Sequence, residues 1–310
     1  MNKVPIVLSF DNNMSLPAAV CISSMMQSAA DNTYYDFFVL YAGSIPEITG
    51  LDKILATYPN MSIQFRSVGN AFADSFEIRG ITKAAYYRLM AASVIPEYDK
   101  AIYADVDMIF RLDLSSLFNL DLGECYFGAV YALSFNLEKK GRDYVASLGL
   151  NPGNYFLSGF LLMNLCKIRE DNLTSLFLQL EKNNYKYQDQ DIMNIVCENR
   201  IMSLPYIYSM TIAAYQGVSM KTDILNTKYM YNPEGVDSLL FSNIHYNGVK
   251  PWKDWCPNLD QWWEAYRHSP IYDPAFYFSF FYNKLGYLDQ LSLIKRIKIL
   301  IRYFVFGQKK

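Results

Sequence analysis

The sequence predicts an α/β protein with a mostly parallel central sheet flanked by helices, followed by a C-terminal helical extension rich in aromatic and basic residues. Three observations lead to this prediction. Short apolar runs with β-branched residues alternate with helix-like segments through most of the chain. Several of these runs are followed at once by polar or acidic residues. The 310 residues are 52% hydrophobic and 19% charged, which is typical of an ordered chain with a large core.

The first part of the chain is predicted to alternate strand and helix. Residues 4–10 form an apolar run, and residues 15–30 are predicted to form a helix with Pro17 in its first turn. The elements predicted next are a strand at 36–41, a helix at 45–58, a strand at 61–67 and a helix at 80–95. Such alternation is typical of a parallel sheet.

The turn after the first strand holds two candidate ligand contacts, Asp11 and Asn13. Open α/β sheets bind ligands where a strand's carboxyl end leads into a helix, so both side chains are candidates for a nucleotide. Asp and Asn are also common helix caps. These residues alone favour neither interpretation.

Residues 101–104 are predicted to be a buried strand that opens into a metal site at Asp105-Val106-Asp107. Two carboxylates interrupt an apolar run, and buried carboxylates need a compensating partner such as a divalent cation. In an extended segment, residues two apart project to the same side, so Asp105 and Asp107 can meet one ion. Oxygen ligands suit Mg²⁺ or Mn²⁺.

The Asp-x-Asp motif is weak evidence by itself. Asp occurs 20 times in the chain, and chance gives roughly one such motif at this composition. The apolar strand before the motif raises the case for a metal site until it and an accidental match are about equally probable. A lone arginine on a helix is usually a surface residue, and only its position just upstream of this strand makes Arg88 a candidate.

The second part of the chain continues the pattern. The predicted elements are strands at 126–132 and 155–164, and helices at 137–148, 173–181 and 192–197. Ser158-Gly159 interrupts a strand, which suggests that a ligand or backbone approaches closely there. Asp189 and Asp191 precede a helix, where capping explains one of them but hardly the whole polar cluster.

His245 and Lys250 lie in the short polar segment at residues 242–252, near the end of the main body. A lone histidine is more often structural than a ligand, but an imidazole beside two carboxylates would suit Mn²⁺. Lys250 would be a natural partner for a diphosphate.

The C-terminal part differs from the rest. We divide the chain into a main domain at 1–256 and an extension at 257–310, and we expect irregular packing over the aromatic-rich residues 251–281. Six basic residues and no acidic ones follow residue 290, which leaves 22 basic against 30 acidic residues before it, a net charge of −8. The six are Lys295, Arg296, Lys298, Arg302, Lys309 and Lys310. Residues 291–306 are predicted to form a basic amphipathic helix. This helix suits an anionic membrane surface, and the alternative is that it docks on the acidic body of the protein.

Several classes of protein are disfavoured. The five cysteines are scattered without a Cys-x-x-Cys, which argues against a disulfide framework or zinc site. The acidic body disfavours nucleic-acid binding. Without a signal-peptide pattern or a spanning apolar segment, we expect a cytoplasmic protein, peripheral on the inner face of the cell membrane.

Taken in order, these motifs resemble glycosyltransferase family 8, and they are most similar to its bacterial lipopolysaccharide galactosyl- and glucosyltransferases. The resemblance covers roughly residues 4–256. It rests on Asp11 and Asn13, Arg88, Tyr-Ala-Asp-Val-Asp, Phe-Leu-Ser-Gly, Tyr-Gln-Asp-Gln-Asp and His-Tyr-Asn-Gly-Val-Lys-Pro-Trp.

The resemblance implies a GT-A fold, which is a Rossmann-like domain that uses a UDP-hexose and Mn²⁺, with Mg²⁺ as an alternative. It implies metal ligands at Asp105, Asp107 and His245, and catalytic roles for Gln190, Asp189 and Asp107. The implied donor-binding residues are Ser9, Asp11, Asn13, Arg88, Asp105, Val106, Ser158, Asp189, Gly248 and Lys250. The acceptor would be a hydroxyl of a glycan or lipooligosaccharide.

Family members retain the anomeric configuration, which frames the expected mechanism. Gln190 is an amide and a poor nucleophile, so we favour front-face attack by the acceptor hydroxyl, with Gln190 as electrostatic support and Asp189 holding sugar hydroxyls. Two departures from the family pattern stand out: Leu157 replaces a common Asn, and the Gly248–Lys250 spacing is one residue short. A nucleotidyltransferase and a catalytically weak glycan-binding protein are the alternatives.

Overall fold

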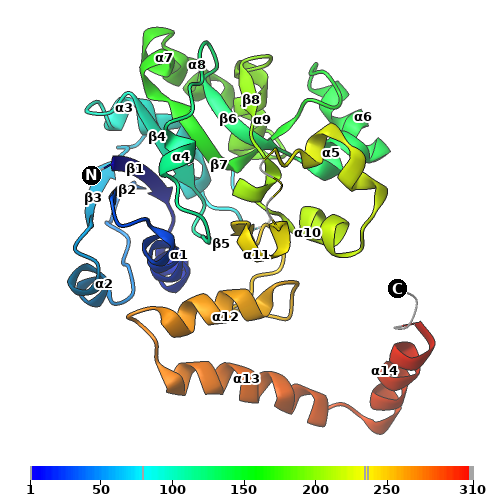
Figure 1. The fold of residues 1–310 in the computed structure, drawn as a ribbon. Coiled ribbons are helices and arrows are strands. Elements are labelled where there is room, and N and C mark those ends of the chain that lie inside the picture. Colours follow the sequence, from blue (N-terminus) through cyan, green and yellow to red (C-terminus); the bar gives the residue numbers. More distant parts are fainter. Residues whose placement is uncertain (1, 79, 234, 236, 307–310) are drawn as a thin grey trace.

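The computed structural model describes residues 2–306 except 79, 234 and 236, and it is built on one seven-stranded sheet (Figure 1). The strands run in the order β3-β2-β1-β4-β7-β6-β8. Their bounds are β1 (Asn2–Ser9), β2 (Thr33–Tyr41), β3 (Met61–Ser67), β4 (Lys100–Ala104), β6 (Phe127–Tyr131), β7 (Phe156–Asn164) and β8 (Ile201–Ser203). Only β7 among these strands runs against its neighbours. The predicted mostly parallel α/β sheet is therefore confirmed.

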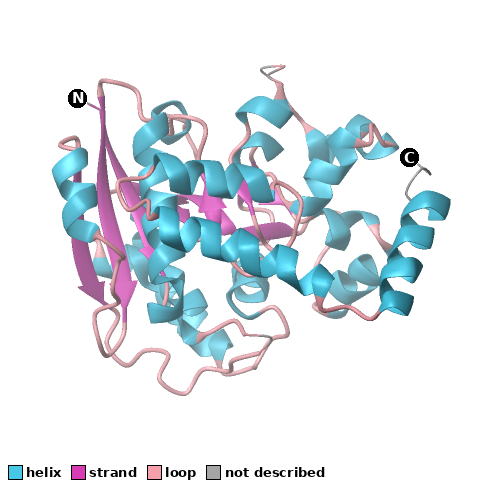
Figure 2. Cartoon of the chain, turned by 90° about the horizontal axis from the view of Figure 1, so that it is seen from below, coloured by secondary structure: helices cyan, strands magenta, loops and turns pink. Residues whose placement is uncertain are grey.

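Helices cover both faces of the sheet (Figures 1 and 2). Residues alternate along β1 between two apolar cores, with Val4, Ile6 and Leu8 in one and Val7 in the other. The helices of the main body are α1 (Ser15–Ser28), α2 (Leu51–Thr57), α3 (Ala91–Val94), α4 (Ser115–Phe118), α5 (Leu133–Leu137), α6 (Lys139–Ser147), α7 (Leu165–Glu170), α8 (Leu173–Glu181), α9 (Gln188–Val196), α10 (Ile212–Ser219) and α11 (Ser238–Phe241). Burial of β1 on both faces explains why its run is almost wholly apolar.

Several predicted helices differ in extent. The helix predicted at 45–58 forms only as α2, because Gly50 adopts a left-handed conformation with φ +61° just before it. The one predicted at 80–95 is a 3₁₀ helix, Lys83–Met90, followed by the short α3. Within this 3₁₀ helix, Arg88 Nε donates to the Ala85 carbonyl. The helix at 137–148 divides into α5 and α6, and α9 begins earlier than predicted.

The prediction of irregular packing over residues 251–281 is wrong. The segment holds α12 (Leu259–His268) and the start of α13 (Pro274–Asp289). Trp262, Trp263 and Tyr266 are buried on one side of α12, against the main core. Burial of these rings on one helix face stabilises a regular helix where the composition suggested none.

The extension ends in the helix predicted at 291–306, observed as α14 (Leu293–Phe306). Figures 1 and 2 both show α14 standing away from the sheet, beyond α13. Lys309 and Lys310 lie outside the described residues, as does the side chain of Arg302. Of the helices in the described part of the chain, none combines the length and apolar character needed to cross a bilayer.

Candidate active site

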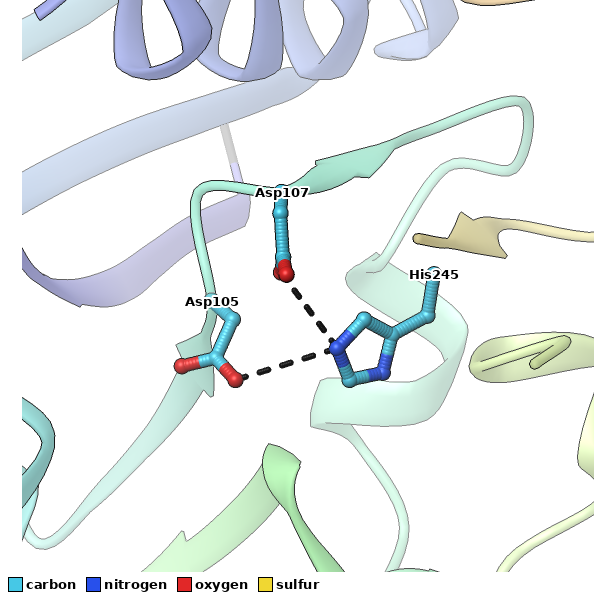
Figure 3. A group of neighbouring side chains, drawn as sticks. All are labelled: Asp105, Asp107 and His245. Atoms are coloured by element: carbon cyan, nitrogen blue, oxygen red, sulfur yellow. Dashed lines mark ion pairs between the residues drawn. The ribbon is translucent and has the colours of Figure 1, made fainter. Parts of the chain in front are cut away.

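The carboxyl end of β4 meets a short two-stranded ribbon, which brings His245 from a distant part of the chain to Asp105 and Asp107 (Figure 3). Asp105 and Asp107 follow β4, and β5 (Met108–Ile109) begins directly after them. This strand pairs with β9 (Ile244–His245), so that Met108 lies opposite His245. The pairing carries His245 Nε2 to 3.3 Å from Asp107 Oδ1 and 3.8 Å from Asp105 Oδ2.

The cluster fits a divalent cation. One ligand atom from each of Asp105, Asp107 and His245 lies within 4.8 Å of the other two. Asp107 Oδ1 is buried without a hydrogen-bond partner, and a buried polar atom of this kind requires compensation. Two carboxylates and an imidazole are ligands that Mn²⁺ accepts. The residues present therefore suit the metal that the resemblance implies.

Gly159 on β7 lies against two of these ligands. A Cβ atom at this position would lie 2.4 Å from His245 Cε1 and 2.6 Å from Asp105 Oδ2. The Gly159 carbonyl also accepts a hydrogen bond from the Asp105 backbone N–H at 2.8 Å. The predicted close approach at this glycine is thus present, and the approaching groups are the two side chains.

Lys250 lies on the other side of Asp107. Its Nζ donates to Asp107 Oδ2 and, at 2.6 Å, to the carbonyl of Tyr246. Burial would raise the pKa of Asp107, but Lys250 and His245 hold that pKa well below its usual range. The shorter spacing from Gly248 therefore still allows Lys250 to reach the cluster.

Arg88 joins the cluster to α9. It is 4% exposed, and its Nη2 donates to Asp105 Oδ1 at 2.8 Å, while its Nε lies 3.2 Å from Asp189 Oδ2. Its Nη1 donates to the carbonyl of Ser158. Asp105 and Asp189 keep the pKa of Arg88 raised despite burial, so the guanidinium stays charged. Arg88 is therefore a buried bridge between two carboxylates.

The two acidic residues at the start of α9 have different environments. Asp191 is fully buried and accepts hydrogen bonds from the hydroxyls of Tyr144 and Tyr155 and from the Tyr187 backbone N–H. Asp189 lines the cleft, its Oδ2 lacks a hydrogen bond, and burial raises its pKa to about 6 against the opposing effect of Arg88. Asp191 is thus the structural residue, and Asp189 is the one available to a ligand.

These residues line one cleft of about 700 Å³. Of the predicted site residues, it is lined by Ser9, Asp11, Arg88, Asp105, Val106, Asp107, Ser158, Asp189, Gln190, His245, Gly248 and Lys250, with Leu157 beside them. Asn13 lines a smaller neighbouring cavity of about 380 Å³, which Asp11 also borders. Asp11 Oδ1 accepts from the Asn13 backbone N–H at 2.8 Å, so the capping interpretation of Asp11 also applies.

The structure adds two side chains that the sequence did not single out. The Tyr103 hydroxyl donates to Asp105 Oδ1 at 2.8 Å, and the Ser209 hydroxyl lies 3.2 Å from His245 Nδ1. A partner at Nδ1 fixes the ring orientation and leaves Nε2 toward the carboxylates. Tyr103 has the sequence context of an ordinary strand residue, and Ser209 lies in an irregular segment. The one sequence signal of a role in the site is that Tyr103 comes two residues before Asp105.

The model for Glycosyl transferase family 8 matches residues 5–256. A putative glycosyltransferase of Haemophilus influenzae is 29% identical over 201 residues, covering 63% of this chain and 60% of that protein. A lipopolysaccharide 1,2-glucosyltransferase of Escherichia coli K12 is 32% identical over 205 residues, covering 63% of this chain and 57% of that protein. The matches thus span less than two thirds of either relative.

A solved structure shares the fold. The galactosyltransferase LgtC, in complex with donor and acceptor sugar analogues, aligns with a TM-score of 0.68 and 25% identity. The alignment covers 84% of this chain and 95% of that one. The GT-A architecture implied by the resemblance is therefore confirmed.

Proposed function

This chain belongs to glycosyltransferase family 8, and we propose that its cleft transfers a hexose, galactose or glucose, from a UDP-sugar to a hydroxyl of a bacterial surface glycan such as lipopolysaccharide. The observation that carries this proposal is the convergence of Asp105, Asp107 and His245 with Lys250 in one cleft. The sugars named for the relatives, glucose and galactose, support a hexose as the transferred group.

The donor would lie along the carboxyl ends of β1 and β4. Asp11 and Asn13 border two adjoining cavities, an arrangement that suits the nucleoside. Ser9, Val106, Ser158 and Gly248 line the same cleft and complete the proposed donor contacts. Lys250, which pairs with Asp107, would meet the diphosphate, and Asp189, which pairs with Arg88, would meet the sugar.

Asp105, Asp107 and His245 would hold a divalent cation, for which we propose Mn²⁺ with Mg²⁺ as an alternative. A bound cation would neutralise the negative charge that develops on the departing diphosphate. Lys250, which contacts Asp107, adds a second positive charge at the same place. Stabilising the leaving group is thus the main task of this side of the cleft.

We propose that transfer retains the anomeric configuration by front-face attack. A double displacement needs a carboxylate nucleophile beside the anomeric carbon. Gln190 lines the cleft with an amide, held by the Ser158 N–H at 3.4 Å and the Tyr155 hydroxyl at 3.3 Å. The Asp189 carboxylate is drawn toward Arg88. Gln190 would then support positive charge on the sugar, and Asp189 would accept hydrogen bonds from sugar hydroxyls.

The C-terminal extension, residues 257–310, would attach the enzyme to the inner membrane surface where a lipooligosaccharide acceptor is assembled. Lys295, Arg296 and Lys298 on α14 are exposed beside exposed apolar residues. Ile294 and Leu300 are 68% and 54% exposed. A basic, apolar helix standing off the body suits an anionic lipid surface better than the alternative of docking on the body.

The other hypotheses have less support. Membership of a glycosyltransferase family argues against a nucleotidyltransferase. The presence of the full cluster of acidic and basic side chains argues against a catalytically weak binding protein.

The proposal is tested by measuring UDP release from UDP-galactose, UDP-glucose and UDP-N-acetylglucosamine, with Mn²⁺ and with EDTA. We expect slow hydrolysis of one UDP-hexose, and the hexose first formed should have the α configuration by NMR. The contradicting result is the absence of both UDP release and calorimetric binding for every donor in the panel. A β product would keep the enzyme class but reject retention.

A further inference from the structure

Tyr103 on β4 lies directly behind the metal-ligand cluster, although it does not line the cleft. Its side chain is fully buried. Its hydroxyl lies 2.9 Å from Ser9 Oγ and 2.8 Å from Asp105 Oδ1. Its ring lies below the Arg88 guanidinium, with 4.2 Å between the guanidinium carbon and the ring centroid. One side chain thus contacts a cleft serine, a carboxylate of the cluster and the buried arginine.

We propose that Tyr103 is a positioning residue that sets the metal affinity of the site by orienting Asp105. This inference rests on the metal site of the proposed function. Tyr103 would touch neither the cation nor the donor, and it would act entirely through Asp105.

The argument begins with the two oxygens of the Asp105 carboxylate. Oδ1 accepts hydrogen bonds from Tyr103 and from Arg88 Nη2, both at 2.8 Å. Oδ2 is the oxygen that faces His245 Nε2, at 3.8 Å. The terminal torsion of an aspartate is broad, so the carboxylate turns freely unless donors hold it. Two donors on Oδ1 therefore leave Oδ2 aimed at the cluster.

The direction of the hydrogen bonds follows from counting protons. Tyr103 has one hydroxyl proton, and the Asp105 carboxylate can only accept, so this proton points to Oδ1. Ser9 must then donate its own proton to Tyr103 Oη. Ser9 also lines the cleft, where its oxygen can only accept from a ligand. The chain from Ser9 through Tyr103 to Asp105 thus links a cleft contact to a metal ligand.

Tyr103→Phe removes the hydroxyl and keeps the ring under Arg88, so it isolates the positioning effect from packing. Tyr35→Phe is a matched control. Tyr35 is also a fully buried strand tyrosine whose hydroxyl donates to an aspartate, Asp113, at 3.1 Å, but Asp113 neither belongs to the metal-ligand cluster nor lines the cleft. Mn²⁺ binding would be measured without donor by calorimetry and by electron paramagnetic resonance. Each protein would also be tested for UDP release across a Mn²⁺ titration.

We expect Tyr103→Phe to weaken Mn²⁺ binding by roughly 10- to 100-fold, as loss of a hydrogen bond to a ligating side chain does elsewhere. Saturating Mn²⁺ should restore most of kcat, because the ligands themselves remain. Tyr35→Phe should bind Mn²⁺ like the wild type even if it lowers the melting temperature. Unchanged Mn²⁺ affinity in folded Tyr103→Phe would overturn the inference.

Ser9→Ala provides a second test if Tyr103→Phe does not fold. Ser9 has no hydrogen bond to Asp105, Asp107 or His245, so any loss of Mn²⁺ affinity without donor must pass through Tyr103. We expect a smaller loss than for Tyr103→Phe, and no loss would contradict the inference. Failure of the wild type to bind Mn²⁺ would instead reject the metal site of the proposed function.

Discussion

Gly159 and His245 lie so close together that no side chain fits between them. A Cβ atom on Gly159 would lie 2.4 Å from His245 Cε1, which is shorter than real Cβ contacts. The same atom would lie 2.6 Å from Asp105 Oδ2. The glycine is thus required by the position of two proposed metal ligands rather than by its own backbone conformation.

Gly159→Ala should abolish metal binding while leaving the sheet folded. The added methyl group must push His245 or Asp105 out of place, because its carbon would lie 2.4 Å from His245 Cε1 and 2.6 Å from Asp105 Oδ2. Gly286→Ala is the control, since a Cβ atom there meets nothing within 4 Å. Calorimetry with Mn²⁺ and far-UV circular dichroism distinguish the two effects. Mn²⁺ affinity equal to the wild type in Gly159→Ala would show that the cluster does not hold the ion.

Asp189→Asn should change how stability depends on pH. Burial raises the pKa of Asp189 to about 6 from 3.8. Above about pH 6 folding therefore has to bury an ionised carboxylate, and the contribution of Asp189 to the stability of the wild type falls by about 3 kcal/mol as pH rises from about 4 to about 6. Asn cannot ionise, so the variant should lack this loss.

The check is urea denaturation of both proteins in EDTA at about pH 3.5 and about pH 7. The stability of Asp189→Asn relative to the wild type should be more favourable at the higher pH by about 3 kcal/mol. The same relative stability at both pH values would mean that Asp189 titrates normally.

Gln190→Ala should lower kcat with little change in the KM of the donor. Gln190 is proposed to stabilise the charge that develops on the sugar during transfer, and removal of one such polar group typically costs about 100-fold in rate. Steady-state UDP release at saturating Mn²⁺ measures both constants. Turnover close to that of the wild type would remove Gln190 from the mechanism.

Replacing Lys295, Arg296 and Lys298 on α14 by glutamine should weaken binding to anionic vesicles. Each basic residue near such a surface contributes about 1 kcal/mol, so the triple variant should bind roughly 100-fold more weakly. A matched control replaces Lys139, Lys140 and Arg142, which are exposed on α6. Vesicle sedimentation with phosphatidylserine gives the comparison. Equal loss in both variants would indicate a general charge effect without a membrane-binding helix.

Much of the sheet could be predicted from local pattern. The strands around Ile6, Phe38 and Ile102 are runs of apolar residues buried on both faces, and such runs are recognisable without knowledge of their partners. The same pattern placed Asp105 and Asp107 at a strand end. Their convergence with His245 depends on the pairing of β5 with β9, two strands of two residues each. Strands this short have no periodicity to detect, so the residues alone left His245 open between a structural role and a metal ligand, and the family resemblance favoured the ligand.

The helix α12 could have been found. Leu259, Trp262, Trp263 and Tyr266 follow the spacing of a helix face. The density of aromatic residues over 251–281 obscured this spacing. Tyr103 and Ser209 are different, because their roles depend on which atoms lie next to them in space. The sequence places Tyr103 two residues before Asp105, but it does not show what the hydroxyl of Tyr103 or of Ser209 contacts.

The measurement that tests the central claim most directly is UDP release by Asp107→Asn with Mn²⁺ and with EDTA. Asp107 offers the cluster a buried oxygen without a hydrogen bond, and the variant removes its charge. Asp99→Asn is the control, because Asp99 is 84% exposed and pairs with Arg169 away from the cleft. We predict that Mn²⁺-dependent release is lost in Asp107→Asn and kept in Asp99→Asn. Release by Asp107→Asn at the wild-type rate, or wild-type release that EDTA does not affect, would contradict the account.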